Sequence, residues 1–122
     1  MSYDKVFHWT KIPPIEIKPG FFRRHLINGE KLTVILSEVR LGSSGHPHCH
    51  PEEQVMFVLK GRCRDHEGRL YKPGTITYVA SNKEHGGLVT VGSEPSIILE
   101  IFAPPRQRDP LVMENDGSRL QG

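Results

Sequence analysis

The sequence of 122 residues lacks any run of about 18 apolar residues, so we expect no membrane-spanning helix. Its first residues lack the basic stretch and apolar segment of a secretory leader, so we expect a cytoplasmic protein. The two cysteines, Cys49 and Cys63, are too few for a disulfide framework, and we expect reduced thiols. Excess charge is also absent: 16 Lys and Arg oppose 14 Asp and Glu, which argues against nucleic-acid binding. Neither a membrane nor a nucleic acid is therefore expected as a partner.

Long helical repeats are missing as well, and the 12 Gly and 10 Pro imply many turns. The apolar residues form short runs, and we predict strands at residues 32–39, 55–59, 69–71, 75–79, 87–91 and 97–102. In the first of these strands, Leu32, Val34 and Leu36 share the face that we predict to be buried. Several short strands punctuated by turns indicate an all-β sandwich or barrel. The length suits one domain, so we predict a single all-β domain over residues 1–122.

The two ends of the chain differ from the middle. Residues 1–20 are predicted to form an irregular or edge-strand arm, because Pro13, Pro14 and Pro19 exclude a helix. Such an arm packs either across a partner subunit or over its own barrel. Residues 103–122 contain Pro104 and Pro105 near their start and are mostly polar after them, which predicts a short extension that frays.

The histidines are the chemical feature of this sequence, since three of the seven fall between positions 46 and 50. His48 and His50 are two apart, so on a strand both rings project from one face. Gln54 follows and can turn its amide oxygen back toward this pair. Imidazole nitrogens suit Zn, Fe, Ni and Cu, an amide oxygen can fill another position, and His85 is the candidate for a fourth ligand. A shifted pair of His46 and His48 is the alternative.

The neighbouring residues have simpler interpretations. Cys49 is predicted to point away from the ligands and into packing, with thiolate ligation as the minor alternative. Cys63 is predicted to be a buried strand residue, and Glu52 and Glu53 are interpreted as solvated loop charges. Structural or surface roles are expected for the remaining histidines, His8, His25 and His66.

Two segments of the sequence resemble the motifs of the cupin family. The first contains Gly42, His48, His50, Gln54 and Gly61, and the second contains Pro73-Gly74, Ala80, Asn82 and His85. The resemblance covers about residues 26–108 and implies a double-stranded β-helix, which is a jelly-roll barrel, with a tail over about 109–122. It also implies that His48, His50, Gln54 and His85 bind one divalent metal ion, which could be Ni, Zn, Fe, Mn or Cu.

Three positions depart from the usual cupin motifs. Gln54 stands where a glutamate ligand is usual, although the neighbouring Glu53 could compete for that role. Thr75 replaces the usual acidic residue after Pro-Gly, and Ala80 replaces the usual proline. The glutamine is similar to that of the uronate-converting, KdgF-like cupins. These single-domain proteins bind metal through three histidines and a glutamine and promote ring opening of an unsaturated monouronate.

The end of the predicted last strand carries the substrate side of this resemblance. KdgF-like cupins have an acidic residue, a phenylalanine and an arginine there, which match Glu100, Phe102 and Arg106, although an aspartate is expected in place of Glu100. The match implies that Glu100 is the general acid/base and that the planar fork of Arg106 binds a substrate carboxylate in the catalytic site. Tyr78 could add a hydroxyl to the pocket, and Met56 is predicted to form its wall.

The donor set also indicates a type of chemistry. Neutral imidazoles and a neutral amide leave a divalent ion with its full charge, which favours polarising a carbonyl or hydroxyl over redox work. Together with this chemistry, the resemblance to KdgF-like cupins implies a metal-dependent isomerase or lyase of carbohydrate metabolism that acts on an unsaturated uronate or a related sugar-acid or keto compound. The alternatives are an Fe(II) cupin dioxygenase and a non-catalytic sugar-binding cupin. The family and the apolar arm imply a homodimer.

Overall fold

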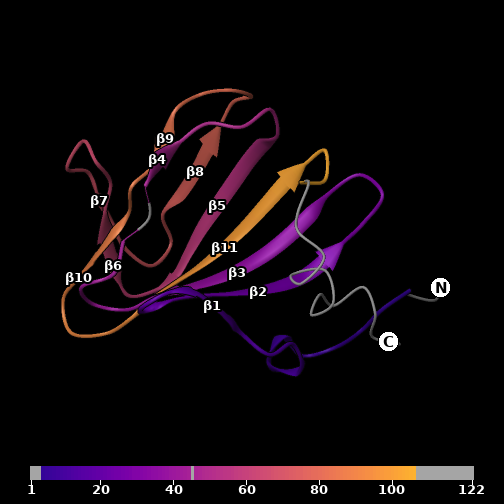
Figure 1. Ribbon diagram of the computed structural model, residues 1–122, viewed down its shortest axis with the longest axis horizontal. Helices are drawn as coiled ribbons and strands as arrows, with labels where there is room; N and C mark the ends of the chain where they lie inside the picture. Colours follow the sequence, from indigo (N-terminus) through magenta and orange to yellow (C-terminus); the bar gives the residue numbers. More distant parts are fainter. Residues whose placement is uncertain (1–3, 45, 107–122) are drawn as a thin grey trace.

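The computed structural model describes residues 4–44 and 46–106 (Figure 1). Across these residues, no helix has the length and apolar character needed to cross a membrane. The described elements are, in order, η1 (Trp9–Lys11), β1 (Ile15–Lys18), β2 (Phe21–Asn28), β3 (Thr33–Val39), β4 (Pro47–His48), β5 (Glu53–Lys60), β6 (Arg62–Arg64), β7 (Leu70–Tyr71), β8 (Ile76–Val79), β9 (His85–Gly86), β10 (Val89–Val91) and β11 (Ser96–Ala103). Apart from the single 3-10 turn η1, these elements are strands, so the predicted all-β class is confirmed.

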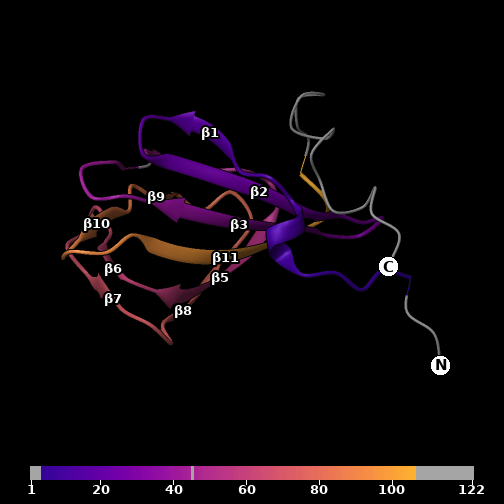
Figure 2. The same ribbon diagram turned by 90° about the horizontal axis from the view of Figure 1, so that it is seen from below.

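The strands form one large and two small antiparallel sheets. The large sheet has six strands in the order β1-β2-β3-β11-β5-β8, so the last strand of the described residues lies between β3 and β5. The small sheets have the orders β10-β6-β7 and β4-β9. Two views at right angles place the β10-β6-β7 sheet toward one end of the large sheet (Figures 1 and 2). The hydroxyl of Thr90 on β10 donates to the carbonyl of Val39 at the end of β3, which ties this small sheet to the large one.

Gly61 lets the chain leave the large sheet directly after β5 and enter the small sheet as β6. Its φ is +75°, a conformation that favours glycine. A Cβ atom at this position would lie 2.7 Å from the Cα of Ser96 and would collide with the carbonyl of Pro95. The backbone conformation and this close approach both explain the glycine that ends the first cupin-like motif.

The core and the candidate site share the inner face of the large sheet. Along β5, Gln54, Met56 and Val58 are buried, whereas the residues between them are partly exposed. One buried cluster joins β5 and β11 of the large sheet to the β10-β6-β7 sheet, and it consists of Met56, Val58, Cys63, Tyr71 and Ile98. The prediction that Cys63 is a buried strand residue is confirmed. The inner face therefore changes from apolar core to polar site along each of these two strands.

On β3, the fully buried face is the one opposite to the prediction. That face carries Thr33, Ile35, Ser37 and Val39, whereas Leu32 lies before the strand and is exposed. Leu36 is buried too, but on the outer face. The inner face borders a polar site and therefore includes a threonine and a serine. The face with Val34 and Leu36 is the more apolar one in the sequence, so the prediction assigned the wrong face to the core.

The N-terminal segment packs on its own sheet. Ile12 is buried, its carbonyl accepts a hydrogen bond from Nε of Arg24 at 2.8 Å, and that guanidinium lies 4.8 Å from the ring centre of Trp9. β1 pairs with β2 as an edge strand, so the large sheet begins at Ile15, upstream of the boundary expected near residue 26. The sequence of β2 has no regular apolar alternation, which is why it was not predicted. The expected tail over 109–122 lies outside the described residues.

Candidate metal centre

The fold brings the predicted ligands together from separate parts of the chain. β4 pairs with β9 so that His48 lies opposite His85. His50 lies just beyond β4, and the backbone N–H of Asn82 donates to its carbonyl at 2.7 Å, which ties together the loops beside β4 and β9. Gln54 is on the inner face of β5. The three histidines offer ring nitrogens that all lie within 4.8 Å of one another.

Each of these imidazoles is oriented by a backbone carbonyl two residues away. The Nδ1 atoms of His48, His50 and His85 lie 2.8, 3.0 and 2.8 Å from the carbonyl oxygens of His46, Glu52 and Lys83. An Nδ1–H that donates to a carbonyl leaves Nε2 as the nitrogen with the lone pair. The rings therefore present lone pairs, not N–H groups, to the centre of the cluster.

The resulting donor set fits a cation. Oε1 of Gln54 lies 2.8 Å from Nε2 of His85 and 3.1 Å from Nε2 of His50, and the two Nε2 atoms are 3.1 Å apart. With the protons on Nδ1, these short contacts join lone pair to lone pair, and a divalent cation among them would convert repulsion into coordination. Burial lowers the pKa of His85 and so favours the neutral ring, which is the form that binds metal. The three histidines and Gln54 could therefore hold a metal ion.

Gln54 also connects the histidines to Glu100. Its Nε2 donates to Oε1 of Glu100 at 3.2 Å, and the hydroxyl of Ser37 donates to Oε2 at 2.9 Å. An amide at this position can offer its oxygen to a cation and its N–H to Glu100 at the same time. An ionised glutamate could not donate to Glu100, which gives a physical reason for glutamine where cupin motifs usually have glutamate.

All of these groups except His50 line a cavity of about 270 Å³, close to the lower limit of about 300 Å³ for ligand pockets of drug-sized molecules. His48, Gln54 and Glu100 supply polar groups, and apolar side chains such as Met56 and Leu88 form much of the wall. A small cavity with a few converging polar groups is typical of a site for a small molecule.

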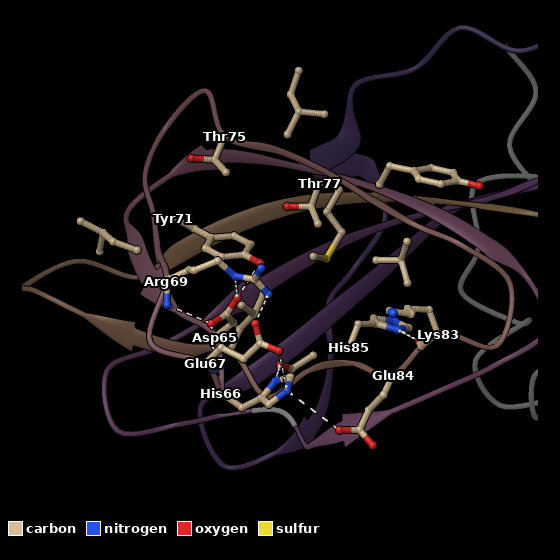
Figure 3. A pocket seen from close by; sticks show the side chains of 17 residues that line it. Asp65, His66, Glu67, Arg69, Tyr71, Thr75, Thr77, Lys83, Glu84 and His85 are labelled. Carbon is tan, nitrogen blue, oxygen red and sulfur yellow. Dashed lines mark hydrogen bonds and ion pairs between the residues drawn. The ribbon is translucent and has the colours of Figure 1, made fainter.

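A larger cavity of about 770 Å³ also reaches His85, but the polar network in it is structural (Figure 3). Asp65 accepts hydrogen bonds from Nε of Arg69 at 2.7 Å, from the hydroxyl of Tyr71 at 3.0 Å and from two backbone N–H groups. Burial by itself raises the pKa of Asp65, but the hydrogen bonds from Arg69, Tyr71 and the backbone outweigh it and lower the pKa to about 2. Asp65 thus holds the turn between β6 and β7, and the smaller cavity, which contains Glu100, is the candidate site.

Glu52 is buried, so its interpretation as a solvated loop charge is wrong. Its Oε1 lies 3.3 Å from Nδ1 of His50 and 3.7 Å from Nε of Arg106. The fold supplies Arg106 as a counter-charge from beyond the end of β11, a partner that no local pattern indicates. The guanidinium of Arg106 also lies 4.9 Å from the ring centre of Phe102, and that ring is 5.5 Å from the ring of His50. Glu52 and Phe102 therefore each contact His50, Arg106 contacts both of them, and none of the three lines the smaller cavity.

Tyr78 also lies outside the smaller cavity. Its side chain is 61% exposed, and its hydroxyl donates to Oε1 of Glu53 at 2.6 Å, which raises the pKa of Tyr78. Because residues alternate along β5, Glu53 faces away from Gln54 and does not reach the imidazoles. Of the predicted substrate-side residues, the structure brings Glu100 and Met56 to the smaller cavity.

The two residues beside the first histidine pair differ in their placement. His46 lines the smaller cavity, but the contact with His48 is made by its backbone carbonyl, and its ring is not among the three clustered imidazoles. Cys49 is exposed, so the prediction that it points into packing is wrong. The prediction assumed that the strand with His48 continues through Cys49, but β4 ends at His48, so strand alternation does not direct the side chain of Cys49.

Three further polar residues at the smaller cavity were missed from the sequence: Lys18, Arg23 and Ser37. Ser37 shares strand parity with Ile35 and Val39, so a polar residue among inward-facing ones was the signal that could have found it. Lys18 and Arg23 lie on β1 and β2, whose patterns carry no such signal.

Comparison with known proteins establishes the fold. No family model and no curated protein matches this sequence. Among solved structures, KdgF from Halomonas sp. matches with a TM-score of 0.76 and 23% identity, covering 84% of this chain and 96% of that one. An RmlC-like cupin from Shewanella frigidimarina matches with 0.74 and 23%, covering 87% and 95%. The polyketide cyclase RemF from Streptomyces resistomycificus matches with 0.73 and 18%, covering 92% and 98%. The chain therefore has the cupin double-stranded β-helix that its motifs predicted.

Proposed function

We propose that this protein, which has the cupin fold, is a metal-dependent enzyme that acts on a small carbonyl or hydroxyl compound. The observation that carries the proposal is the position of Gln54, which contacts two imidazoles through its oxygen and Glu100 through its nitrogen. Three of the four proposed ligands, His48, Gln54 and His85, thus line the same small cavity as the carboxylate of Glu100. Lewis-acid catalysis coupled to proton transfer requires this combination.

The residues of the cavity have separate roles in this proposal. A divalent metal ion held by the three histidines and Gln54 would supply Lewis-acid polarisation of a substrate oxygen. Glu100 accepts the proton released from the substrate and returns it, since each carboxylate oxygen has acceptor capacity beyond the one hydrogen bond it receives. Ser37 and Gln54 hold that carboxylate in place, so it needs no reorientation when the proton moves.

The proposed reaction is ring opening or isomerisation of an unsaturated uronate or a related sugar-acid or keto compound. Ring opening of a hemiacetal breaks the bond between the anomeric carbon and the ring oxygen. A proton leaves the anomeric hydroxyl and one is delivered to the ring oxygen, so one proton-transfer group suffices and no co-substrate is consumed. The likeness in fold to KdgF, the neutral donor set and the size of the cavity all support this reaction class.

The test combines metal analysis with a proton-NMR assay on an unsaturated uronate. We expect Glu100→Gln to retain metal and to lose roughly 100- to 10,000-fold in turnover, because it removes the proton-transfer group. Glu94→Gln is the matched control, since Glu94 is exposed on the turn before β11. Unchanged turnover in Glu100→Gln would remove it as the acid/base. Purified protein that takes up no divalent metal would exclude the metal-dependent mechanism.

The same preparations distinguish the two alternative functions. Oxygen uptake with a candidate substrate would indicate an Fe(II) dioxygenase, against which the neutral donor set argues. Sugar binding by metal-free protein, with no turnover of any substrate, would indicate a non-catalytic binding module.

A further inference from the structure

Two cations from the N-terminal strands face the candidate cavity. Lys18 ends β1 and Arg23 lies near the start of β2, and both line the cavity together with Phe21. The Nζ of Lys18 lies 5.8 Å from the ring centre of Phe21, and the guanidinium carbon of Arg23 lies 5.2 Å from it. Two positively charged side chains that line the cavity therefore both lie close to one aromatic ring.

Arg23 has no anionic partner among the described residues. Its Nε is buried and makes no hydrogen bond there, and neither Arg23 nor Lys18 forms an ion pair with any residue of that part of the chain. Glu100 is the acidic residue of the cavity, and it accepts its hydrogen bonds from Ser37 and Gln54 instead. A buried donor without a partner is costly, so an anion bound here would relieve that cost.

The strand register places this cation pair relative to Glu100. Arg23 on β2 pairs with Ser37 on β3, and Ser37 pairs with Ile98 on β11. The backbones of β2 and β11 are therefore separated by two strand spacings, which together make about 10 Å. Ser37 stands between them and donates to Glu100. An anionic group held by Arg23 would thus lie on the opposite side of Ser37 from the proton-transfer group. This separation suits a molecule with a carboxylate at one end and its reacting carbon several bonds away.

We propose that Arg23, assisted by Lys18, binds the carboxylate of an anionic sugar-sized substrate. The planar guanidinium can bind a carboxylate through two parallel hydrogen bonds, and the ring of Phe21 holds it in position for them. Arg106, the arginine that the family resemblance indicates for this purpose, contacts Glu52 and Phe102 and does not line the cavity. The term substrate rests on the proposed function, whereas the anion site itself rests on the contacts of Arg23.

The experiment measures binding, not turnover, by NMR titration of the metal-loaded protein as purified. The probes are D-glucuronate and D-glucose, which differ mainly in one carboxylate. We expect wild type to bind glucuronate more tightly than glucose, and Arg23→Gln to weaken glucuronate binding roughly 10-fold or more without changing glucose binding. Arg23→Lys keeps the charge but not the fork and should fall between wild type and Arg23→Gln. Arg62→Gln is the control, because Arg62 is exposed on β6 outside the cavity.

Metal content and thermal unfolding are recorded for each variant, so that a binding loss is not confused with loss of metal or fold. If Arg23→Gln does not fold, Lys18→Gln provides the second measurement and should weaken glucuronate binding alone. Wild-type affinity for glucuronate in Arg23→Gln would overturn the proposal, as would equal binding of both sugars by wild type. Inactivity toward every uronate, with binding of glucuronate still dependent on Arg23, would contradict the proposed function and leave the anion site standing.

Discussion

Replacing Gln54 by glutamate tests the central contact of the site. In wild type, Nε2 of Gln54 donates to Oε1 of Glu100 across 3.2 Å, and Gln54 is 2% exposed. Gln54→Glu preserves the size of the side chain and replaces this donor with a second carboxylate oxygen. The variant therefore converts a hydrogen bond into a contact between two negative charges at a buried position.

The distance sets the magnitude of the effect. Two unit charges 3.2 Å apart repel each other by about 5 kcal/mol at an effective dielectric constant of about 20. Leaving a buried charge uncompensated typically costs about 3–5 kcal/mol, so we expect a loss of that order in the free energy of unfolding of the metal-free protein. Since whole domains are stable by about 5–15 kcal/mol, such a loss is large.

The assay is urea unfolding at pH 8, with and without a chelator. A divalent cation beside both carboxylates offsets their repulsion, so metal should stabilise Gln54→Glu more than it stabilises wild type. The double variant Gln54→Glu/Glu100→Gln exchanges the two groups and restores one donor and one acceptor. It should recover most of the lost stability, with a coupling energy of about 2 kcal/mol or more between the two positions.

Two results would refute this reasoning. If metal-free Gln54→Glu unfolds at the same urea concentration as wild type, the two side chains do not repel each other and are not in contact. If the effects of the single changes simply add in the double variant, Gln54 and Glu100 are not coupled.

Three further predictions concern metal, pH and assembly. Loss of a residue that only hydrogen-bonds to a metal ligand lowers metal affinity by roughly 10- to 100-fold, and His85→Ala should lower it by more than that because His85 itself is a proposed ligand. His66→Ala should leave the affinity unchanged. Stoichiometric metal in His85→Ala would exclude His85 as a ligand. The pKa of Asp65 is lowered from its ordinary 3.8 to about 2, so its stabilisation is complete above about pH 4 and is lost as the pH falls through 2. That difference is worth at most about 2.5 kcal/mol, and we expect about 1 kcal/mol because Arg69 is exposed. Urea unfolding of Asp65→Asn and wild type should therefore differ more at pH 7 than at pH 2. The homodimer stays a prediction, and light scattering that gives the mass of a single chain would contradict it.

The parts of the site that sequence reasoning found depend on short-range order. His48 and His50 are two residues apart, and such a spacing on an extended segment directs two rings to one side whatever the rest of the fold does. The all-β class likewise followed from short apolar runs and frequent turn residues, which restrict secondary structure locally. Glu100 was indicated by the resemblance to KdgF-like cupins, because the strand around it is apolar on both faces and gives no local signal, and the structure does bring it to the cavity.

The errors arose where a residue's environment comes from a distant segment. Glu52 looks like a loop charge in the sequence, and it is buried because Arg106 and His50 surround its carboxylate. The inner face of β3 was misassigned because it borders a polar cavity that other strands complete. Cys49 was assumed to continue a strand that ends one residue earlier.

By itself, the sequence determined an all-β domain with a pair of histidines, a glutamine and a later histidine suited to one metal ion, because periodicity and spacing act within a few residues. Only the tertiary structure decided which charged side chains meet. Strand pairing across the large sheet sets Gln54 beside Glu100 and brings Arg23 to the cavity, whereas Arg106 is engaged by Glu52. Charges interact through space, and their partners are therefore chosen by sheet order and register, which no single segment of the chain encodes.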